Sequence, residues 1–146
     1  AMYSSIEADK QIMPLKEVRD LEGCGLVFIG LPIVQMGPAK EAVEFLNKHA
    51  AGRKVALFAT HAAPEESPHL EKWLTPAREA ASQAMVMGTF SCRGELAQTV
   101  KEAMLKSGNP QLVAWAKGDD SQGQLDETQL ERARGFAREI IESQSE

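Results

Sequence analysis

Cysteine, surplus basic charge and long apolar runs are all scarce in this sequence. The two cysteines, Cys24 and Cys92, fit neither a zinc site nor a CxxC redox motif. Cysteines this sparse predict reduced thiols in a cytoplasmic protein, with a single disulfide as the open alternative. No grouping of histidine, cysteine and acidic residues has the spacing of metal ligands, so no metal site is expected.

The charge balance and the hydropathy exclude two further classes of partner. The net charge is −5 at pH 7, which argues against binding to nucleic acid or to an anionic membrane surface. The longest apolar run, Leu26–Val34, is about half of the roughly 20 residues that span a bilayer. The polar N-terminal stretch has no signal-peptide pattern. We therefore expect a globular protein that contacts neither nucleic acid nor membrane.

One stretch, from Gly25 to Leu46, organises the predicted fold. Leu26–Ile29 is apolar and rich in β-branched and aromatic residues, which indicates a strand buried on both faces of a parallel sheet. From Ala39 on, apolar residues recur three and four apart, which indicates a helix with Pro38 in its first turn. The uncharged segment Leu31–Gly37 is predicted to be a loop at the carboxyl end of the strand, where α/β sheets bind ligands.

The rest of the chain alternates strand and helix in the same way. Two further strands are predicted over Lys54–Ala59 and Ala84–Phe90, and Gly88 indicates a bulge or a close approach in the second. Helices are predicted over residues 67–83, from 95 to about 104, over 109–115 and from a cap at 126. We expect one α/β domain over residues 2–146, with a parallel sheet covered by helices on both faces.

Several motifs resemble flavodoxins in their order and spacing. Gly30–Val34 followed by Gly37 and Pro38 is similar to the third strand and loop of that family, and Lys54–Ala63 to its fourth strand and second flavin loop. Phe90–Gly94 resembles the F-x-C-x-G turn of one flavodoxin branch, and residues 126–138 resemble its acidic, then Ala/Arg-rich, last helix. The resemblance implies a flavodoxin-like three-layer α/β/α sandwich with strand order 2-1-3-4-5.

The same resemblance implies an FMN-dependent electron carrier, or an accessory electron-carrier subunit of a reductase, with a redox protein as partner. No catalytic residue is implied, because the redox chemistry would belong to the flavin. The implied cofactor-binding residues form two walls around the flavin ring, together with the cysteine of the F-x-C-x-G turn: Pro32, Ile33, Val34, Gln35, Met36 and Gly37; Thr60, His61 and Ala62; and Cys92.

One family feature is missing. Flavodoxins open with a central strand and a Thr-Gly-x-Thr loop that holds the flavin phosphate at a helix N-terminus, and this sequence has no such motif. FMN binding is therefore expected to be weak or absent. Met2 is either an internal methionine or the start of a naturally shortened chain. The alternative function is a flavodoxin-like domain that binds no flavin, as an interaction module or a truncated fragment. A flavin-dependent quinone reductase is a third.

The absent central strand leaves a position beside Leu26–Ile29 to be filled. Gln11–Leu15 could shift into it, although Pro14 lacks the N–H that a strand paired on both sides needs. Leu112–Ala116 would have to change from helix to strand. We therefore expect a homodimer, in which the partner covers the edge of Leu26–Ile29.

Two predicted site residues carry alternatives of their own. His61 would titrate near neutrality, but without an acid or nucleophile beside it we interpret it as a loop residue. The thiol of Cys92, next to Arg93, has either a lowered pKa or a structural role, and we favour the structural role.

Overall fold

The computed structural model describes residues 1–145 and contains one sheet; Glu146, the last residue of the predicted domain, lies outside this range. The strands are β1 (Val27–Val34), β2 (Gly37–Pro38), β3 (Lys54–His61) and β4 (Met85–Arg93), in the order β2-β1-β3-β4. β1, β3 and β4 are parallel, and β2 runs antiparallel to the end of β1.

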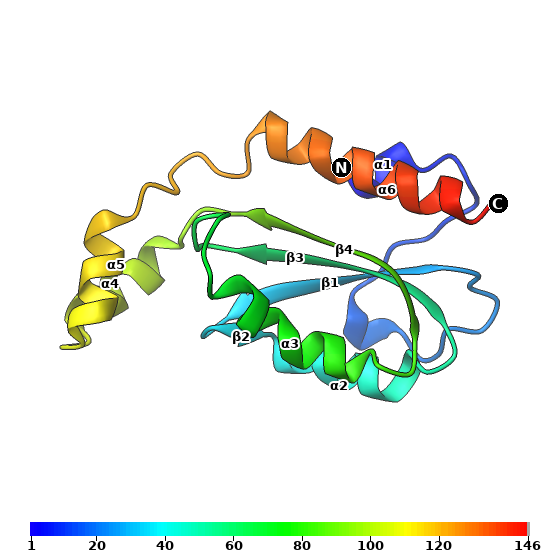
Figure 1. The fold of residues 1–146 in the computed structure, drawn as a ribbon, viewed down its shortest axis with the longest axis horizontal. Coiled ribbons are helices and arrows are strands. Elements are labelled where there is room, and N and C mark those ends of the chain that lie inside the picture. Colours follow the sequence, from blue (N-terminus) through cyan, green and yellow to red (C-terminus); the bar gives the residue numbers. More distant parts are fainter. Residues whose placement is uncertain (146) are drawn as a thin grey trace.

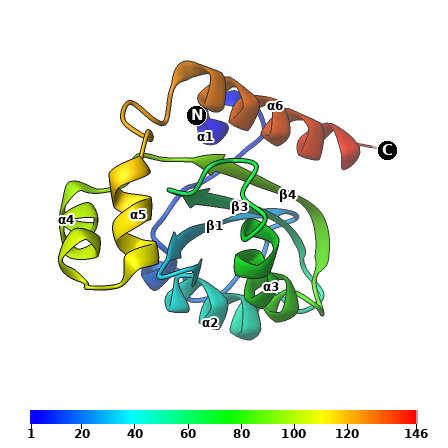
Figure 2. The same ribbon diagram turned by 60° about the vertical axis from the view of Figure 1, so that its left-hand side comes forward.

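Helices cover both faces of this sheet (Figures 1 and 2). α2 (Lys40–His49) and α3 (Leu70–Ala80) lie on one face, and α6 (Glu127–Ser143) lies along β4 on the other with α1 (Met2–Ser5) beside it. α4 (Gln98–Lys106) and α5 (Pro110–Gly118) pack on each other at one end of the molecule. The predicted three-layer α/β/α fold with a mainly parallel sheet is confirmed.

The main core lies between the sheet and the α2–α3 layer. Alternate residues of a strand point to the same face, so Ile29 and Leu31 of β1 and Leu57 of β3 all reach this core, each at most 1% exposed. Leu46 of α2 and Leu74 of α3 close it from the helix side. Each such aliphatic side chain contributes roughly 1.5–3 kcal/mol when fully buried.

The opposite face packs against α6 through aromatic rings and one glycine. Phe136 of α6 lies edge-on to Phe28 and stacked on Phe90, with ring centroids 6.3 and 5.5 Å apart. Gly88 lies directly under Ile140 of α6. The register of β3 with β4 shifts at this point: Val55 pairs with Val86 and Ala56 with Gly88, so the residue just before Gly88 has no partner on β3. Both the bulge and the close approach predicted at Gly88 are therefore present.

All three parallel strands continue further than predicted. β1 runs through Pro32 to Val34, so the predicted loop Leu31–Gly37 is wrong: the chain turns at residues 35–36 and returns as β2. Pro32 is tolerated because it needs no N–H at the outer edge, where its carbonyl accepts a hydrogen bond from the N–H of Ala39 (2.9 Å). Pro38 belongs to β2 rather than to the first turn of α2.

Several helix boundaries also differ from the prediction. α3 begins at Leu70 rather than near Ser67 and ends at Ala80. α4 begins only at Gln98, and Met104 is its one buried residue because α4 packs mainly against α5. α5 is helical, capped by Asn109 with Pro110 in its first turn, so the helix predicted over 109–115 is confirmed and Leu112–Ala116 forms no strand.

The N-terminal segment forms no strand. Gln11–Leu15 is not a strand, and the chain instead has a short 3-10 helix, η1 (Leu15–Glu17), beside α2. Within residues 1–145, no strand precedes β1. β1 is therefore an edge strand, and neither of the two internal fillings for the missing strand is adopted.

Candidate functional site

The predicted site residues gather at the carboxyl ends of the three parallel strands. Pro32 of β1 is in register with Thr60 of β3, and Thr60 with Cys92 of β4. Residues in register share a face of the sheet, so this row crosses the sheet on the side of α6. It brings the β1–β2 hairpin and the loop after β3 together at the edge where open α/β sheets bind ligands.

The hairpin between β1 and β2 has an exposed apolar tip. Val34 and Met36 are 54% and 58% exposed. Gln35 and Met36 have φ values of 51° and 65°, the left-handed region that a two-residue type I′ hairpin turn requires and that glycine or asparagine usually occupies. Strained backbone of this kind concentrates at functional sites. Ile33 points inward and packs against Ala63, Leu70 and Trp73.

A shallow hollow of about 290 Å³ lies beside this hairpin. Its lining comes from the hairpin and from the start of α2: Val34, Gln35, Pro38, Ala39, Lys40 and Glu41. Two of the predicted wall residues, Val34 and Gln35, therefore face an open concavity.

His61 is the last residue of β3 and is only 4% exposed, so its interpretation as a loop residue is wrong. Its Nδ1–H donates to the carbonyl of Ala63 (2.9 Å), and the buried Nε2 has no partner among the described residues. Burial lowers the pKa of His61, against the hydrogen bond to Ala63, which raises it. The ring is therefore neutral at pH 7 and keeps a free acceptor at Nε2.

Cys92 is a buried free thiol on the α6 side of β4, 6% exposed, and Cys24 is also free. Burial, assisted by the negative charge of Glu65, raises the pKa of the Cys92 thiol. The lowered-pKa alternative is wrong, because the side chains of Arg93 and Cys92 point to opposite faces of the strand. The structural role we favoured agrees with this environment.

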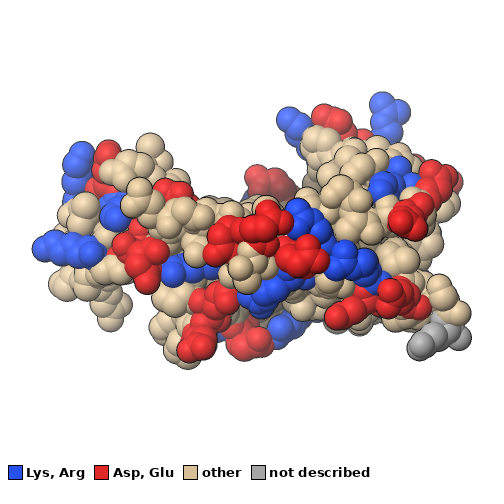
Figure 3. All heavy atoms as spheres, turned by 90° about the horizontal axis from the view of Figure 1, so that it is seen from above, with Lys and Arg blue, Asp and Glu red and all other residues tan. Residues whose placement is uncertain are grey.

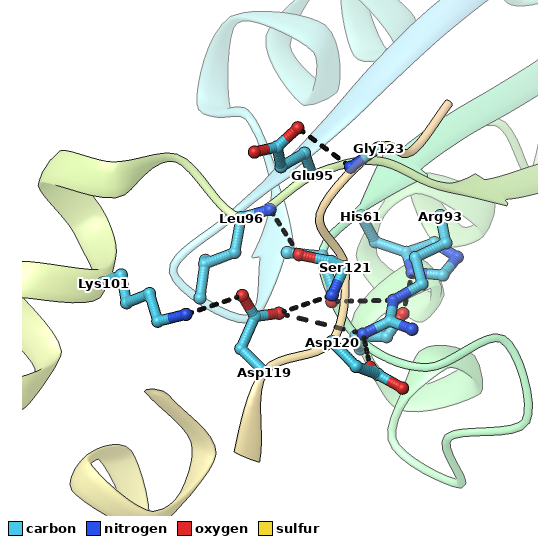
Figure 4. Close-up of polar contacts among 11 residues, drawn as sticks. His61, Arg93, Glu95, Leu96, Lys101, Asp119, Asp120, Ser121 and Gly123 are labelled. Carbon is cyan, nitrogen blue, oxygen red and sulfur yellow. Dashed lines mark hydrogen bonds and ion pairs between the residues drawn. The ribbon is translucent and has the colours of Figure 1, made fainter. Parts of the chain in front are cut away.

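A polar cluster behind the site escaped the sequence analysis (Figure 4). The guanidinium of Arg93 lies 2.6 Å from the carboxylate of Asp120 and 3.8 Å from that of Asp119, and Lys101 lies 3.3 Å from Asp119. Burial alone would raise the pKa of Asp119, but hydrogen bonds from Ser121 and Lys101 outweigh it and hold that pKa below its ordinary value.

The same cluster holds together the two ends of the segment that contains α4 and α5, residues 95–123, called the excursion below. The hydroxyl of Ser121, fully buried, accepts the backbone N–H of Leu96 (2.8 Å), and Glu95 accepts the N–H of Gly123 (3.3 Å). By its composition the stretch 118–123 indicates only a polar linker. No signal could have paired it with Arg93 and Leu96, because such contacts, about 25 residues apart along the chain, leave no periodicity.

A second contact joins the excursion to the α3 layer. The indole rings of Trp73 on α3 and Trp115 on α5 stack with centroids 6.0 Å apart and an interplanar angle of 13°. The ring of His69 also stacks on Trp73, with centroids 6.0 Å apart. This aromatic stack holds α5 beside the loop that follows β3.

Comparison with known families decides what kind of domain this is. The family model for the flavodoxin domain matches residues 1–137. The chain belongs to the flavodoxin domain family. Among proteins of curated function, none matches the chain. In residues 1–145 of this flavodoxin domain, every helix is too short or too polar to traverse a lipid bilayer.

The flavin that the family implies can be compared with the residues present. The exposed apolar tip at Val34 and Met36 and the partly exposed Thr60 and Ala62 suit the flat, largely apolar ring of a flavin. The phosphate of FMN needs converging N–H groups, hydroxyls or cations, and the Thr-Gly-x-Thr loop is missing. The residues of this flavodoxin domain therefore fit the ring and not the phosphate.

The outer face of α6 is an ordinary solvated surface. Figure 3 shows acidic and basic side chains side by side over this helix. Arg134 pairs with Glu127 and Glu131 at 2.6 and 3.0 Å, and Arg138 pairs with Glu131 at 2.9 Å. The alternation of sign leaves no patch of one charge on the helix.

Proposed function

We propose that this flavodoxin domain holds a flavin ring between the β1–β2 hairpin and the loop after β3, and serves as an electron carrier or an accessory electron-carrier subunit. The observation that carries the proposal is the register of Pro32, Thr60 and Cys92, which sets the two predicted walls side by side at the carboxyl edge. A redox protein would be its partner, in the cytoplasm.

The residues of the two walls would have different roles. Val34 and Met36 would cover the ring with apolar surface, and the hydroxyl of Thr60 and the backbone of residues 35–36 would hydrogen-bond its polar edge. The neutral ring of His61 would keep the second wall free of positive charge. A bound flavin would supply the electron transfer, and these contacts would tune its potential.

Two features favour the alternative of a flavodoxin domain that binds no flavin and acts as an interaction module. The phosphate loop is missing, and β2 pairs with the outer edge of β1 at Ile33 and Val34. That pairing occupies part of the edge beside which the central strand of a flavodoxin would lie.

Titration with FMN and with riboflavin, which has the ring but no phosphate, separates these functions. We expect a colourless protein as purified, and quenching of flavin fluorescence with dissociation constants in the range of tens of micromolar or weaker. Because no phosphate anchor is present, the two constants should agree within about threefold. A loss of several charge-assisted hydrogen bonds, each roughly 1.5–3 kcal/mol, accounts for the weakness.

Met36→Glu and Met85→Glu provide a matched pair, because each methionine is 58% exposed and Met85 lies at the far end of β4. Met36→Glu should weaken riboflavin binding by about tenfold through the charge placed against the ring, and Met85→Glu should not. Absence of binding of both flavins at millimolar concentration would refute the flavin function and support the interaction module.

A further inference from the structure

The outer edge of β1 is open along most of its length. β2 pairs only with Ile33 and Val34, and the N–H of Ala39 adds a hydrogen bond to Pro32. Within the described residues, no strand pairs with β1 on this side before Pro32. The unpaired part of this edge is therefore bounded by β2 at its carboxyl end. At its amino end it is bounded by the turn before the strand, where Gly23 has a φ of 74°.

The hydrogen-bonding groups on this edge can be assigned from one contact. Successive residues of a strand direct their N–H and C=O groups to opposite edges, and the carbonyl of Pro32 points outward to Ala39. Gly30, Phe28 and Leu26 therefore point outward as well. The N–H and C=O groups of Ile29 and Leu31 point to β3, with which β1 pairs over residues 27–32.

β1 lacks the devices that normally protect an edge strand. No charged residue occurs between Glu22 and Lys40, and charge, bulges and proline are the usual protection. Pro32 lies only where β2 already covers the edge. The other edge strand, β4, differs in both respects: its pairing with β3 is interrupted by a register shift, and it ends at Arg93.

We propose that a second copy of this chain pairs with β1 along Leu26–Gly30, antiparallel, with the two-fold axis at Phe28. Phe28 would pair with Phe28 of the second copy, and Leu26 with Gly30 of the second copy, so that every outward N–H and C=O group from 26 to 30 finds a partner. The open edge is five uncharged residues long and is bounded by β2 at one end and by the turn at Gly23 at the other. Two such edges can satisfy each other's N–H and C=O groups around a two-fold axis only if the strands run antiparallel. The two sheets become one.

The segment after α1 is the competing occupant of this edge. α1 contacts α6 and η1 contacts α2, so residues 6–14 cross from one helix layer to the other, as Figure 1 shows. Ile12 and Met13, which point to opposite sides in an extended chain, are 73% and 45% exposed. Within residues 1–145, no hydrogen bond joins residues 7–14 to β1. The segment does not fill the edge.

Light scattering and sedimentation test the proposal on the full chain. At about 100 µM the protein should have twice the monomer mass of 15.9 kDa. Leu26→Pro removes an outward N–H from each copy and should weaken the dimer roughly tenfold or more, whereas Leu26→Ala keeps that N–H and should weaken it far less. A monomer at this concentration, or equal dissociation constants for the two variants, would overturn the proposal.

Hydrogen exchange on the unmodified protein gives a second readout that depends on no variant. The amides of Phe28 and Gly30 should be protected at high protein concentration and should exchange faster on dilution. Protection that is independent of concentration would assign the edge to residues 6–14 of the same chain and contradict the dimer.

Discussion

Replacing Gly88 by alanine is expected to force α6 away from the sheet. A Cβ atom at position 88 would lie 2.7 Å from Cδ1 of Ile140 and 3.0 Å from Cε2 of Phe136. Carbon atoms in contact are normally about 3.5–4.0 Å apart, so the helix or its side chains must move by about 1 Å. Overpacking of this kind typically lowers the free energy of unfolding by about 1–3 kcal/mol.

The structure supplies a variant that should relieve the clash. Ile140→Val deletes Cδ1, the atom nearest to the new methyl group, and alone should cost about 0.5–1.5 kcal/mol. The loss of unfolding free energy in the double variant should therefore be smaller than the sum of the two single losses by roughly 0.5–2 kcal/mol. Gly135→Ala is the control: it lies inside α6 with no atom within 4 Å of a new Cβ, and should stabilise by about 0.5–1 kcal/mol.

Urea unfolding followed by circular dichroism, at one fixed protein concentration, measures the free energy of unfolding of the parent protein and of the four variants. Strict additivity of Gly88→Ala and Ile140→Val would refute the packing argument, because it would mean that the methyl group and Cδ1 do not compete for space. A neutral Gly88→Ala variant would refute it as well.

Two further predictions concern the site. Burial lowers the pKa of His61 from its ordinary value of 6.5, so the unfolded chain binds more protons than the folded one below about pH 6.5. The stability that this group contributes above that pH is therefore lost as the pH falls toward the pKa of the folded state. His61→Gln should make the urea midpoint fall less steeply between about pH 7 and 5, and an unchanged slope would contradict this. Trp115→Ala removes the stack on Trp73 and should cost about 2 kcal/mol, with faster tryptic cleavage at Lys101, Lys106 and Lys117; cleavage at the rate of the unmodified protein would exclude a role of the stack in holding α5.

The fold was predictable where local pattern and burial coincide. Val27–Ile29 of the predicted run Leu26–Ile29 lies in β1 and Lys54–Ala59 lies in β3, because these apolar runs face helices on both sides. The cap at Asp126 is confirmed, since its carboxylate accepts the N–H of Gln129 (3.0 Å). The glycine at 88 was informative for a physical reason: only a residue without a side chain lets α6 approach β4 this closely.

The strand ends were not predictable because partners distant in sequence decide them. Thr60 and His61 continue β3 since Cys92 and Arg93 lie opposite them, more than 30 residues later. Pro32 suggested a loop, but its missing N–H faces an edge where none is needed. For the candidate site, the sequence indicated the carboxyl side of β1, β3 and β4, but not the burial of His61 and Cys92, which depends on the layers packed above and below them.

The hydrogen bonds that join Leu96 to Ser121 and Glu95 to Gly123 give the region between them the character of an insertion. Its two ends meet at one point of the sheet, so the rest of the domain would lose no crossing connection if α4 and α5 were replaced by a short turn. The entropy of closing a loop changes only slowly with its length, which makes this edge a place where segments of different size and sequence are tolerated. Such segments would stand beside the hairpin tip and the loop after β3, so the surroundings of the candidate site can diversify while the sheet beneath it stays unchanged.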